Sequence, residues 1–170
     1  MSPIPNLATE RLRLRAFTLD DLDAYAAMCA DPEVMRYIGP GGPVGRDLAW
    51  RHLALFLGEW ALHGRGMWAL ERRSDRQLVG RVGFLEPEGW PGCELAWLLA
   101  RDAWGQGYAF EAARAARAFG RDALGVVAPI SLIRPQNLRS IALAERLGAQ
   151  REREVELAGG SAHLYRHPAT

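Results

Sequence analysis

The chain of 170 residues is 49% hydrophobic and 24% charged, and its formal net charge is +1. These values are typical of one globular domain with a buried core; they exclude a disordered chain and give no argument for nucleic acid as a partner. The apolar runs are too short to cross a membrane, no signal segment opens the chain, and two cysteines indicate no disulfide framework. We expect residues 1–170 to form a single cytoplasmic domain, a monomer or a homodimer, without a nucleic-acid or membrane partner.

Hydrophobic periodicity predicts two helices and three strands in the first half of the chain. In order, these are a strand at 11–17, a helix from 18 to about 28, a helix at 46–62, and a hairpin of strands at 67–72 and 78–85. Thr18 and Asp21 are spaced as an N-cap and its capping-box partner. The second helix repeats large apolar residues at helical spacing, which predicts its buried side. These residues are Trp50, Leu53, Leu57 and Trp60.

Strands and helices alternate in the second half of the chain. In order, these are a strand at 93–99, a helix at 111–123, a strand at 130–134, a helix at 137–147, and a hairpin of strands at 150–157 and 161–166. Gly148 stops the last helix, because glycine adopts the left-handed conformation that ends helices. Strands with helices inserted on both sides predict an α/β fold, in the broad sense that includes α+β, with a mixed sheet.

The segment Trp-Gly-Gln-Gly-Tyr-Ala at 104–109 lies between the strand at 93–99 and the helix at 111–123. A loop that leads into a helix presents free backbone N–H groups to one point, and the positive end of the helix dipole faces that point. Gly105 and Gly107 allow the backbone to approach a diphosphate closely, because neither has a Cβ atom. This loop therefore predicts a pyrophosphate site.

Motifs of other phosphate-binding and hydrolytic sites are missing from the sequence. The chain has no lysine and hence no Walker-type loop, and no Gly-x-Gly-x-x-Gly follows the first strand. It also lacks His-Glu-x-x-His, Cys-x-x-Cys and Gly-x-Ser-x-Gly. His163 and His167 are four residues apart, but in a predicted strand and tail, where they would not converge on a metal. We expect no metal cofactor.

Three segments resemble motifs of the GNAT N-acetyltransferases and occur in the family's order. The loop at 104–109 resembles the acyl-CoA loop, Arg/Gln-x-x-Gly-x-Gly/Ala, with Gly107 and Ala109 at the last two fixed positions and Trp104 in place of Arg or Gln. Residues 134–148 resemble the Pro-x-Asn-x-x-Ser-Ile…Glu-Lys-Leu-Gly signature of the RimJ/RimL-type subgroup, which acetylates ribosomal-protein N-termini. The third match is the sequence at 9–15 followed by Asp-Pro-Glu-Val-Met-Arg-Tyr at 31–37.

The resemblance implies a mixed, mostly antiparallel central sheet with helices on both faces, in which the parallel strands at 93–99 and 130–134 splay apart. It also implies acetyl-CoA as co-substrate, its diphosphate held by backbone N–H groups of the loop and its pantetheine arm paired with the strand edge in the gap. Asn137, an amide donor and acceptor, would fix the pantetheine near the thioester. The implied cofactor-binding residues are Trp97, Leu98, Leu99, Trp104, Gly105, Gln106, Gly107, Tyr108, Ala109 and Asn137.

Amine acetylation requires a group that removes a proton from the amine and benefits from one that protonates the departing thiolate. Glu94, where the subgroup has a carboxylate, is the candidate base acting through water; an ordinary strand-edge carboxylate is its alternative role. The tyrosine acid of many family members would fall at Ala144, so the usual acid is missing. Ser140 shares a helix face with Asn137 and is the candidate acid, with a helix-terminus hydrogen bond as its alternative role.

Two aromatic residues are candidates for the acceptor pocket: Tyr37, from the segment 31–37, and Trp90, in a Gly/Pro loop close to Glu94. Tyr165 is an alternative proton donor, although a tyrosine on a closing strand is more often part of the core. The resemblance implies an acetyl-CoA-dependent N-acetyltransferase that acts on a primary amine by direct attack in a ternary complex. A protein N-terminal α-amine is the implied acceptor; a small-molecule amine (amino acid, polyamine or antibiotic) and a catalytically silent acyl-CoA-binding module stay open.

Overall fold

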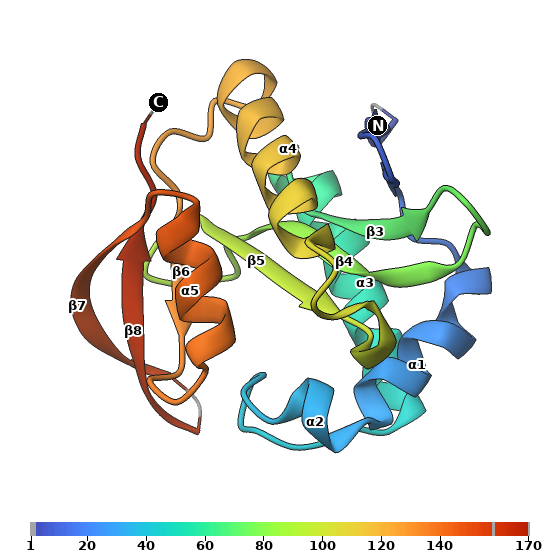
Figure 1. Cartoon of the computed structure of the whole chain (residues 1–170), viewed down its shortest axis with the longest axis horizontal. Helices are drawn as coiled ribbons and strands as arrows, with labels where there is room; N and C mark the ends of the chain where they lie inside the picture. Colours follow the sequence, from blue (N-terminus) through green and yellow to red (C-terminus); the bar gives the residue numbers. More distant parts are fainter. Residues whose placement is uncertain (1–2, 158, 170) are drawn as a thin grey trace.

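A computed structural model of the chain describes residues 3–157 and 159–169. Eight strands form one sheet in the order β1-β2-β3-β4-β5-β6-β8-β7, and β5 with β6 is its parallel pair (Figure 1). The other neighbouring strands are antiparallel. The strands are β1 (Leu7–Ala8), β2 (Leu12–Arg15), β3 (Met67–Arg72), β4 (Leu78–Leu85), β5 (Glu94–Leu99), β6 (Ile130–Ile133), β7 (Gln150–Leu157) and β8 (Gly160–Arg166).

Helices cover both faces of this sheet (Figure 1). They are α1 (Leu22–Ala30), α2 (Pro32–Met35), α3 (Arg46–His63), α4 (Tyr108–Ala123) and α5 (Leu138–Arg146), with short 3₁₀ turns η1 (Leu19–Asp21) and η2 (Arg101–Ala103). On one face α4 packs through the small side chains of Ala112, Ala113 and Ala116. On the other face α1 and α3 contribute Tyr25 and Phe56 to a second core. The predicted mixed, mostly antiparallel sheet between helices is therefore confirmed. No helix in the described part of the chain is long and apolar enough to span a bilayer.

The observed boundaries follow the predicted ones closely, with instructive differences. The β3–β4 hairpin has the predicted bounds, whereas α4 begins at Tyr108, three residues earlier than predicted, directly after its N-cap Gly107. The prediction missed α2, although Asp31 caps it by accepting hydrogen bonds from the backbone N–H groups of Glu33 (2.8 Å) and Val34 (3.4 Å). It also missed β1, because two residues are too few to show an alternation.

The predicted buried side of α3 was partly wrong. Leu53 and Trp60 are buried, but Trp50 is 52% exposed and Leu57 40% exposed. The helix turns a different row inward, which also contains the buried residues Ala49 and Phe56. Ala49 is small, so a search for large apolar residues passes over it, although it is fully buried. The exposed tryptophan and leucine lie beside the buried row rather than in it.

The parallel pair of β5 and β6 is joined at one end and open at the other. Its register contains a single residue pair, Glu94 with Ile130, and the strands diverge beyond it. At this junction the Ser131 hydroxyl donates to the Leu95 carbonyl oxygen (2.6 Å) and lies 2.9 Å from His167 Nε2. Because the hydroxyl proton goes to Leu95, the imidazole Nε2–H is the donor to Ser131. Side chains therefore bridge the two strands just before they separate.

Candidate active site

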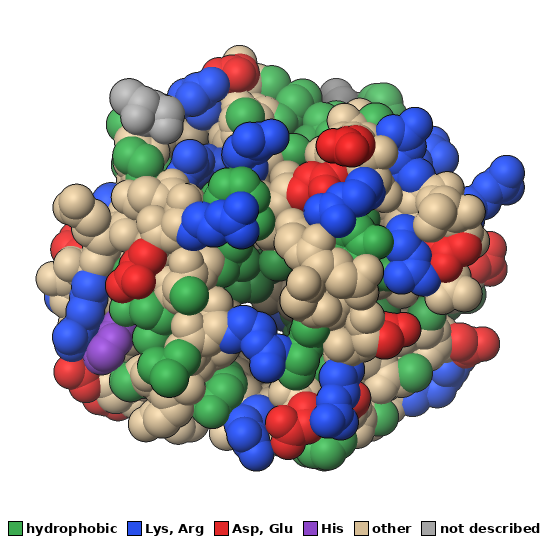
Figure 2. All heavy atoms as spheres, in the orientation of Figure 1, with side chains coloured by type: hydrophobic (Ala, Val, Ile, Leu, Met, Phe, Trp, Pro, Cys, Tyr) green, Lys and Arg blue, Asp and Glu red, His purple; other side chains and the backbone are tan. Residues whose placement is uncertain are grey.

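A cavity of about 500 Å³ opens where β5 and β6 diverge, between the N-terminal ends of α4 and α5; we call it the cofactor cavity. Figure 2 shows the molecule hollowed at its centre, with cationic side chains around the hollow, all of them arginines because the chain has no lysine. Every predicted cofactor residue except Gln106 lines this cavity. The Gln106 side chain instead donates to the Asp102 carbonyl oxygen (2.8 Å). The side chain of Gln106 thus supports the loop, while the role predicted for this residue concerns its backbone N–H group.

The loop at 104–109 has the backbone shape that an anion cradle requires. Gly105 and Gly107 have φ angles of +73° and +80°, in the left-handed region that favours glycine. A Cβ atom on Gly105 would meet nothing within 4 Å, so the space beside the loop is open. The first helical bond of α4 at this point runs from Glu111 N–H to the Gly107 carbonyl (3.1 Å), which leaves the N–H groups of the first turn directed outward. This geometry fits the diphosphate of a coenzyme A molecule.

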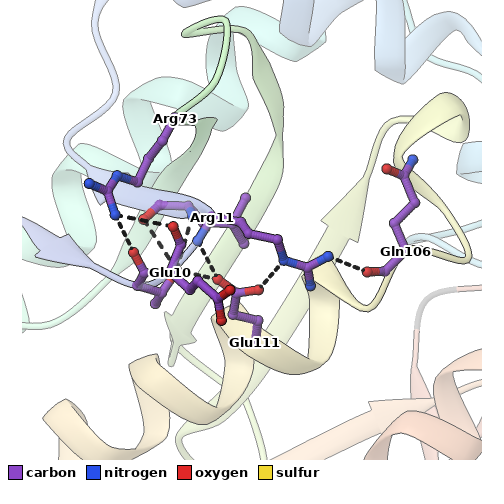
Figure 3. Close-up of polar contacts among 7 residues, drawn as sticks. Glu10, Arg11, Arg73, Gln106 and Glu111 are labelled. Carbon is purple, nitrogen blue, oxygen red and sulfur yellow. Dashed lines mark hydrogen bonds and ion pairs between the residues drawn. The ribbon is translucent and has the colours of Figure 1, made fainter.

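Arg11 fixes this loop from the neighbouring strand region, as Figure 3 shows. Its Nε donates to Glu111 Oε2 (2.7 Å) and its Nη1 donates to the Gln106 carbonyl oxygen (2.8 Å). Thr9 donates its hydroxyl to the other oxygen of Glu111 (2.6 Å), and Arg73 donates to the Thr9 carbonyl oxygen (2.8 Å). The cradle is therefore held in shape before any ligand binds. The sequence analysis missed Arg11 as a positioning residue, because nothing in a short motif links it to a loop 95 residues away.

Along β5, the backbone N–H and C=O groups of successive residues point alternately toward β4 and toward the cofactor cavity. The Ala100 N–H donates to the Val79 carbonyl across the antiparallel ladder (2.9 Å). Because successive residues point to opposite sides, the polar groups of Leu98 face β4, and those of Trp97 and Leu99 face the gap. The Leu99 carbonyl already accepts from the Trp104 indole (3.0 Å). Leu98 therefore lines the cavity with its side chain, and the strand-edge pairing expected of its backbone is corrected to Trp97 and Leu99.

Aromatic rings with arginines above them form the rim of the cofactor cavity. The Arg139 guanidinium carbon lies 3.7 Å from the Trp104 ring centre, and that of Arg146 lies 4.0 Å from the Phe110 ring centre. Planar guanidinium groups stack on such rings while keeping their N–H donors available. Trp104, which stands where the family has Arg or Gln, thus holds an arginine in place at the same rim.

A second cavity, of about 280 Å³, lies on the other side of Trp97; we call it the acceptor cavity. Trp97 and a few other residues border both cavities, so the two spaces meet at a common wall. The wall consists of Tyr37, Ile38, Trp97, Asn137 and Ser140. Glu94 and Trp90, which the sequence analysis assigned to acid–base chemistry and acceptor binding, both line the acceptor cavity.

Glu94 is 8% exposed and lies at the junction of β5 and β6. Burial raises the pKa of its carboxyl group, while hydrogen bonds from Trp90 and Leu132 counteract this shift in part. Trp90 Nε1 donates to Oε2 (2.8 Å), and the Leu132 N–H donates to Oε1 (3.4 Å). A carboxylate with a raised pKa is a better proton acceptor than an exposed one.

Asn137 and Ser140 lie at the start of α5. Asn137 is the N-cap, and its Oδ1 accepts from the Ser140 N–H (3.3 Å). The Ser140 hydroxyl oxygen accepts from Trp97 Nε1 (3.2 Å), so the hydroxyl proton is available for another acceptor. Tyr165, the alternative proton donor, is 3% exposed, packs in a core cluster with Ile133 and lines neither cavity.

The described part of this α/β fold thus presents two cavities that share a wall beside a splayed parallel strand pair, and one of them ends at a helix N-terminus. The sequence model of the acetyltransferase (GNAT) domain matches residues 11–150. The chain is also 30% identical over 161 residues to the "Uncharacterized N-acetyltransferase p20" of Bacillus licheniformis, covering 91% of this chain and 89% of that protein. The chain belongs to the GNAT acetyltransferase family and is an N-acetyltransferase, which confirms the family predicted from its motifs.

Solved structures agree with this assignment. The acetyltransferase from Agrobacterium tumefaciens strain C58 is 32% identical and superposes with a TM-score of 0.86, covering 98% of this chain and 96% of that one. The structure of RimL, a ribosomal L7/L12 α-N-protein acetyltransferase in complex with coenzyme A, is 16% identical with a TM-score of 0.78 and 98% of each chain covered. At this identity the second likeness is one of fold.

Proposed function

We propose that the protein transfers the acetyl group of acetyl-CoA to a primary amine by direct attack in a ternary complex. The observation that carries the proposal is the common wall, because molecules held in the cofactor and acceptor cavities meet at Trp97, Asn137 and Ser140. Acetyl-CoA supplies the acetyl group as a thioester. The N–H groups of 105–109 would hold its diphosphate, and the backbone groups of Trp97 and Leu99 would pair with the pantetheine arm.

Glu94 is the proposed base. An ammonium group cannot attack, so a proton must leave the amine, and the buried Glu94 carboxylate lies in the acceptor cavity where it can accept that proton through water. Trp90 holds one carboxylate oxygen and thereby orients the other. The backbone N–H groups at the open edge of β5 are placed to stabilise negative charge on the acetyl oxygen.

Ser140 is the proposed acid. The indole of Trp97 occupies one lone pair of its hydroxyl oxygen, and this leaves the O–H to donate toward the departing sulfur. The position seven residues after Asn137, where many relatives have a tyrosine, is the buried Ala144. Tyr37 and Ser140 are the hydroxyl-bearing residues that border both cavities, and Ser140 is the one that lies on α5, the helix that carries Asn137 as its N-cap.

The proposed acceptor is an α-amine, and a protein N-terminus is the first candidate. The motif at 134–148 resembles that of N-terminal acetyltransferases, and RimL shares the fold. A small-molecule amine is the second candidate, because the acceptor cavity of about 280 Å³ is small and holds one residue-sized group.

The test is acetyl-CoA-dependent release of free thiol with a panel of amines. The panel contains peptides that begin with Ala, Ser or Met, free amino acids, polyamines and aminoglycosides. Turnover with at least one amine is the expected result, and the accepted class identifies the acceptor. If acetyl-CoA binds but no amine is acetylated, the proposal is wrong and a silent acyl-CoA-binding module replaces it.

A further inference from the structure

Arg81 is a buried cation in the wall of the acceptor cavity. It lies on β4, opposite Leu98 of β5, and is 7% exposed. Its Nε and Nη1 atoms are buried without a hydrogen-bond partner among the described residues. Its guanidinium carbon lies 5.1 Å from the Phe56 ring centre, which offers a weak attraction only. The Tyr25 hydroxyl forms a hydrogen bond with this guanidinium, and Glu94 attracts it, but the two other donor atoms have no acceptor. Buried donors without an acceptor are costly, so their presence in the wall of a cavity requires an explanation.

Arg15 is an arginine whose positive charge is fully compensated by carboxylates, and it serves as a comparison for Arg81. Arg15 donates to Asp21 through Nη1 and Nη2 (both 2.8 Å) and to Glu71 through Nε (2.7 Å). Two carboxylates thus neutralise a side chain that is 18% exposed. Arg81 is more deeply buried, yet it forms no ion pair within the part of the chain that the structure describes.

Three titratable groups near Arg81, those of Tyr25, Cys29 and His52, are neutral at physiological pH. Burial raises the pKa of Tyr25 to about 12 and raises that of the Cys29 thiol, so neither is an anion. Burial and the nearby Arg81 lower the pKa of His52, so this histidine is an uncharged imidazole. Glu94 is the acidic residue that shares the acceptor cavity with Arg81. Its hydrogen bonds come from Trp90 and Leu132, and the positive charge of Arg81 attracts it without an ion pair and offsets part of the rise in its pKa that burial causes.

We infer that Arg81 binds the carboxylate of the acceptor, which is therefore an amine that carries a carboxylate close to its amino group. This inference rests on the proposed function, because it assumes that the acceptor occupies the cavity beyond Trp97. A positive group at Arg81 and a negative group at Glu94 match an amino acid with its carboxylate at one and its ammonium at the other. The carboxylate has two sources: the α-carboxylate of a free amino acid, or the side chain of an acidic residue at a peptide N-terminus.

The test compares acceptors that differ in this carboxylate alone. Free amino acids are paired with their amides, and peptides that begin with Glu or Asp are paired with peptides that begin with Gln or Asn. The wild-type enzyme should have a kcat/KM about 10- to 100-fold higher for the carboxylate member of one of these pairs, and the pair that shows it identifies the source. Arg81→Met should abolish this preference and Arg81→Lys should keep part of it. Equal rates for both members of every pair, or an unchanged preference in Arg81→Met, overturn the inference.

Two further measurements are needed. The first shows whether a variant is still folded, and the second tests the inference even if the proposed function is wrong. Arg81→Met should leave the melting temperature nearly unchanged, because it removes a buried charge that is compensated only in part, whereas Arg15→Met should lower it by about 10 °C by leaving the carboxylates of Asp21 and Glu71 without their cation. If the wild type acetylates no amine, the proposed function fails, and the inference is decided by calorimetry with N-acetylated amino acids and their amides. Tighter binding of the carboxylate form by the wild type, lost in Arg81→Met, supports it; equal or no binding overturns it.

Discussion

The cofactor cavity and the acceptor cavity share a wall but are built in different ways. The cofactor cavity is lined mainly by the segment 97–110, which contains the glycine loop with its backbone N–H groups, together with α5 and residues 33–38. The acceptor cavity is lined by residues scattered over α3, β4, β5, β6, the β7–β8 hairpin, the start of α5, and the loops that follow α2 and precede β5. A ligand site made of backbone leaves a motif in the sequence, because glycines and a helix start must follow in order. A site made of side chains depends on which distant elements the fold brings together. The cofactor cavity therefore identifies the family, whereas the acceptor cavity determines which acceptor is bound.

Gly107→Val should have the largest effect and should remove the function of the cofactor cavity alone. A Cβ atom on Gly107 would lie 3.4 Å from Arg11 Nη2, so the valine would crowd the arginine that shapes the cradle, in a backbone conformation with φ +80° that a β-branched residue resists. We expect acetyl-CoA binding, measured by calorimetry, to be lost. The matched control is Gly125→Val, at φ +67° and outside both cavities, which bears the same backbone strain. Normal binding by Gly107→Val would show that the loop is not the diphosphate site.

Glu94→Gln should affect the acceptor side alone. We expect kcat/KM for the amine to fall by about 10³-fold while the Kd for acetyl-CoA stays unchanged. Glu59→Gln is the control, because Glu59 is equally buried and lines neither cavity. An equal loss in both variants would assign the effect to the fold.

The pH profile adds a second test of Glu94. A base works when deprotonated, and burial raises its pKa, so the wild-type rate should fall as pH drops below that raised pKa. The Gln variant should lose this acidic limb and keep the limb that belongs to the amine. If both profiles coincide, another group removes the proton.

Ser140→Ala tests the wall that the two cavities share. We expect kcat to fall by about 10²-fold with little change in the Kd for acetyl-CoA. Trp97→Phe removes the indole that orients the Ser140 hydroxyl and should cost less, because the hydroxyl remains. A greater loss in Trp97→Phe than in Ser140→Ala would assign the importance of this contact to the tryptophan.

His167, which contacts Ser131 at the junction of β5 and β6, should make the free energy of unfolding depend on pH. Burial lowers the pKa of His167 to about 4 from an ordinary value of 6.5. Between about pH 4 and pH 6.5, His167 is protonated in the unfolded chain but not in the folded chain. The contribution of His167 to the free energy of unfolding is therefore complete above pH 6.5 and is lost as the pH falls toward 4. The expected loss is about 3 kcal/mol by denaturant titration. His167→Gln should flatten this dependence, and His63→Gln, at the more exposed end of α3, should not.

The sequence predicted more of the cofactor cavity than of the acceptor cavity, for a physical reason. The β3–β4 hairpin, the end of α5 before Gly148 and the loop glycines depend on neighbours in the chain, so local patterns identify them. The inward row of α3 depends on which side the sheet offers, and the prediction there was half wrong at Trp50 and Leu57. Arg81 was missed because arginine is common in this chain; its one signal is that it is the only charged residue in β4. Arg11 was missed because its partners lie far away in the sequence.

The positions of the tryptophans allow the binding of each substrate to be followed by intrinsic fluorescence. Trp104 lines the cofactor cavity, Trp90 lines the acceptor cavity and Trp97 borders both, whereas Trp60 and Trp68 pack edge to face in the core. Indole emission responds to whatever molecule arrives beside the ring, so each substrate should change the fluorescence of a different subset. Stopped-flow mixing of the unlabelled enzyme with acetyl-CoA and amine, in either order, can then reveal which of the two substrates binds first.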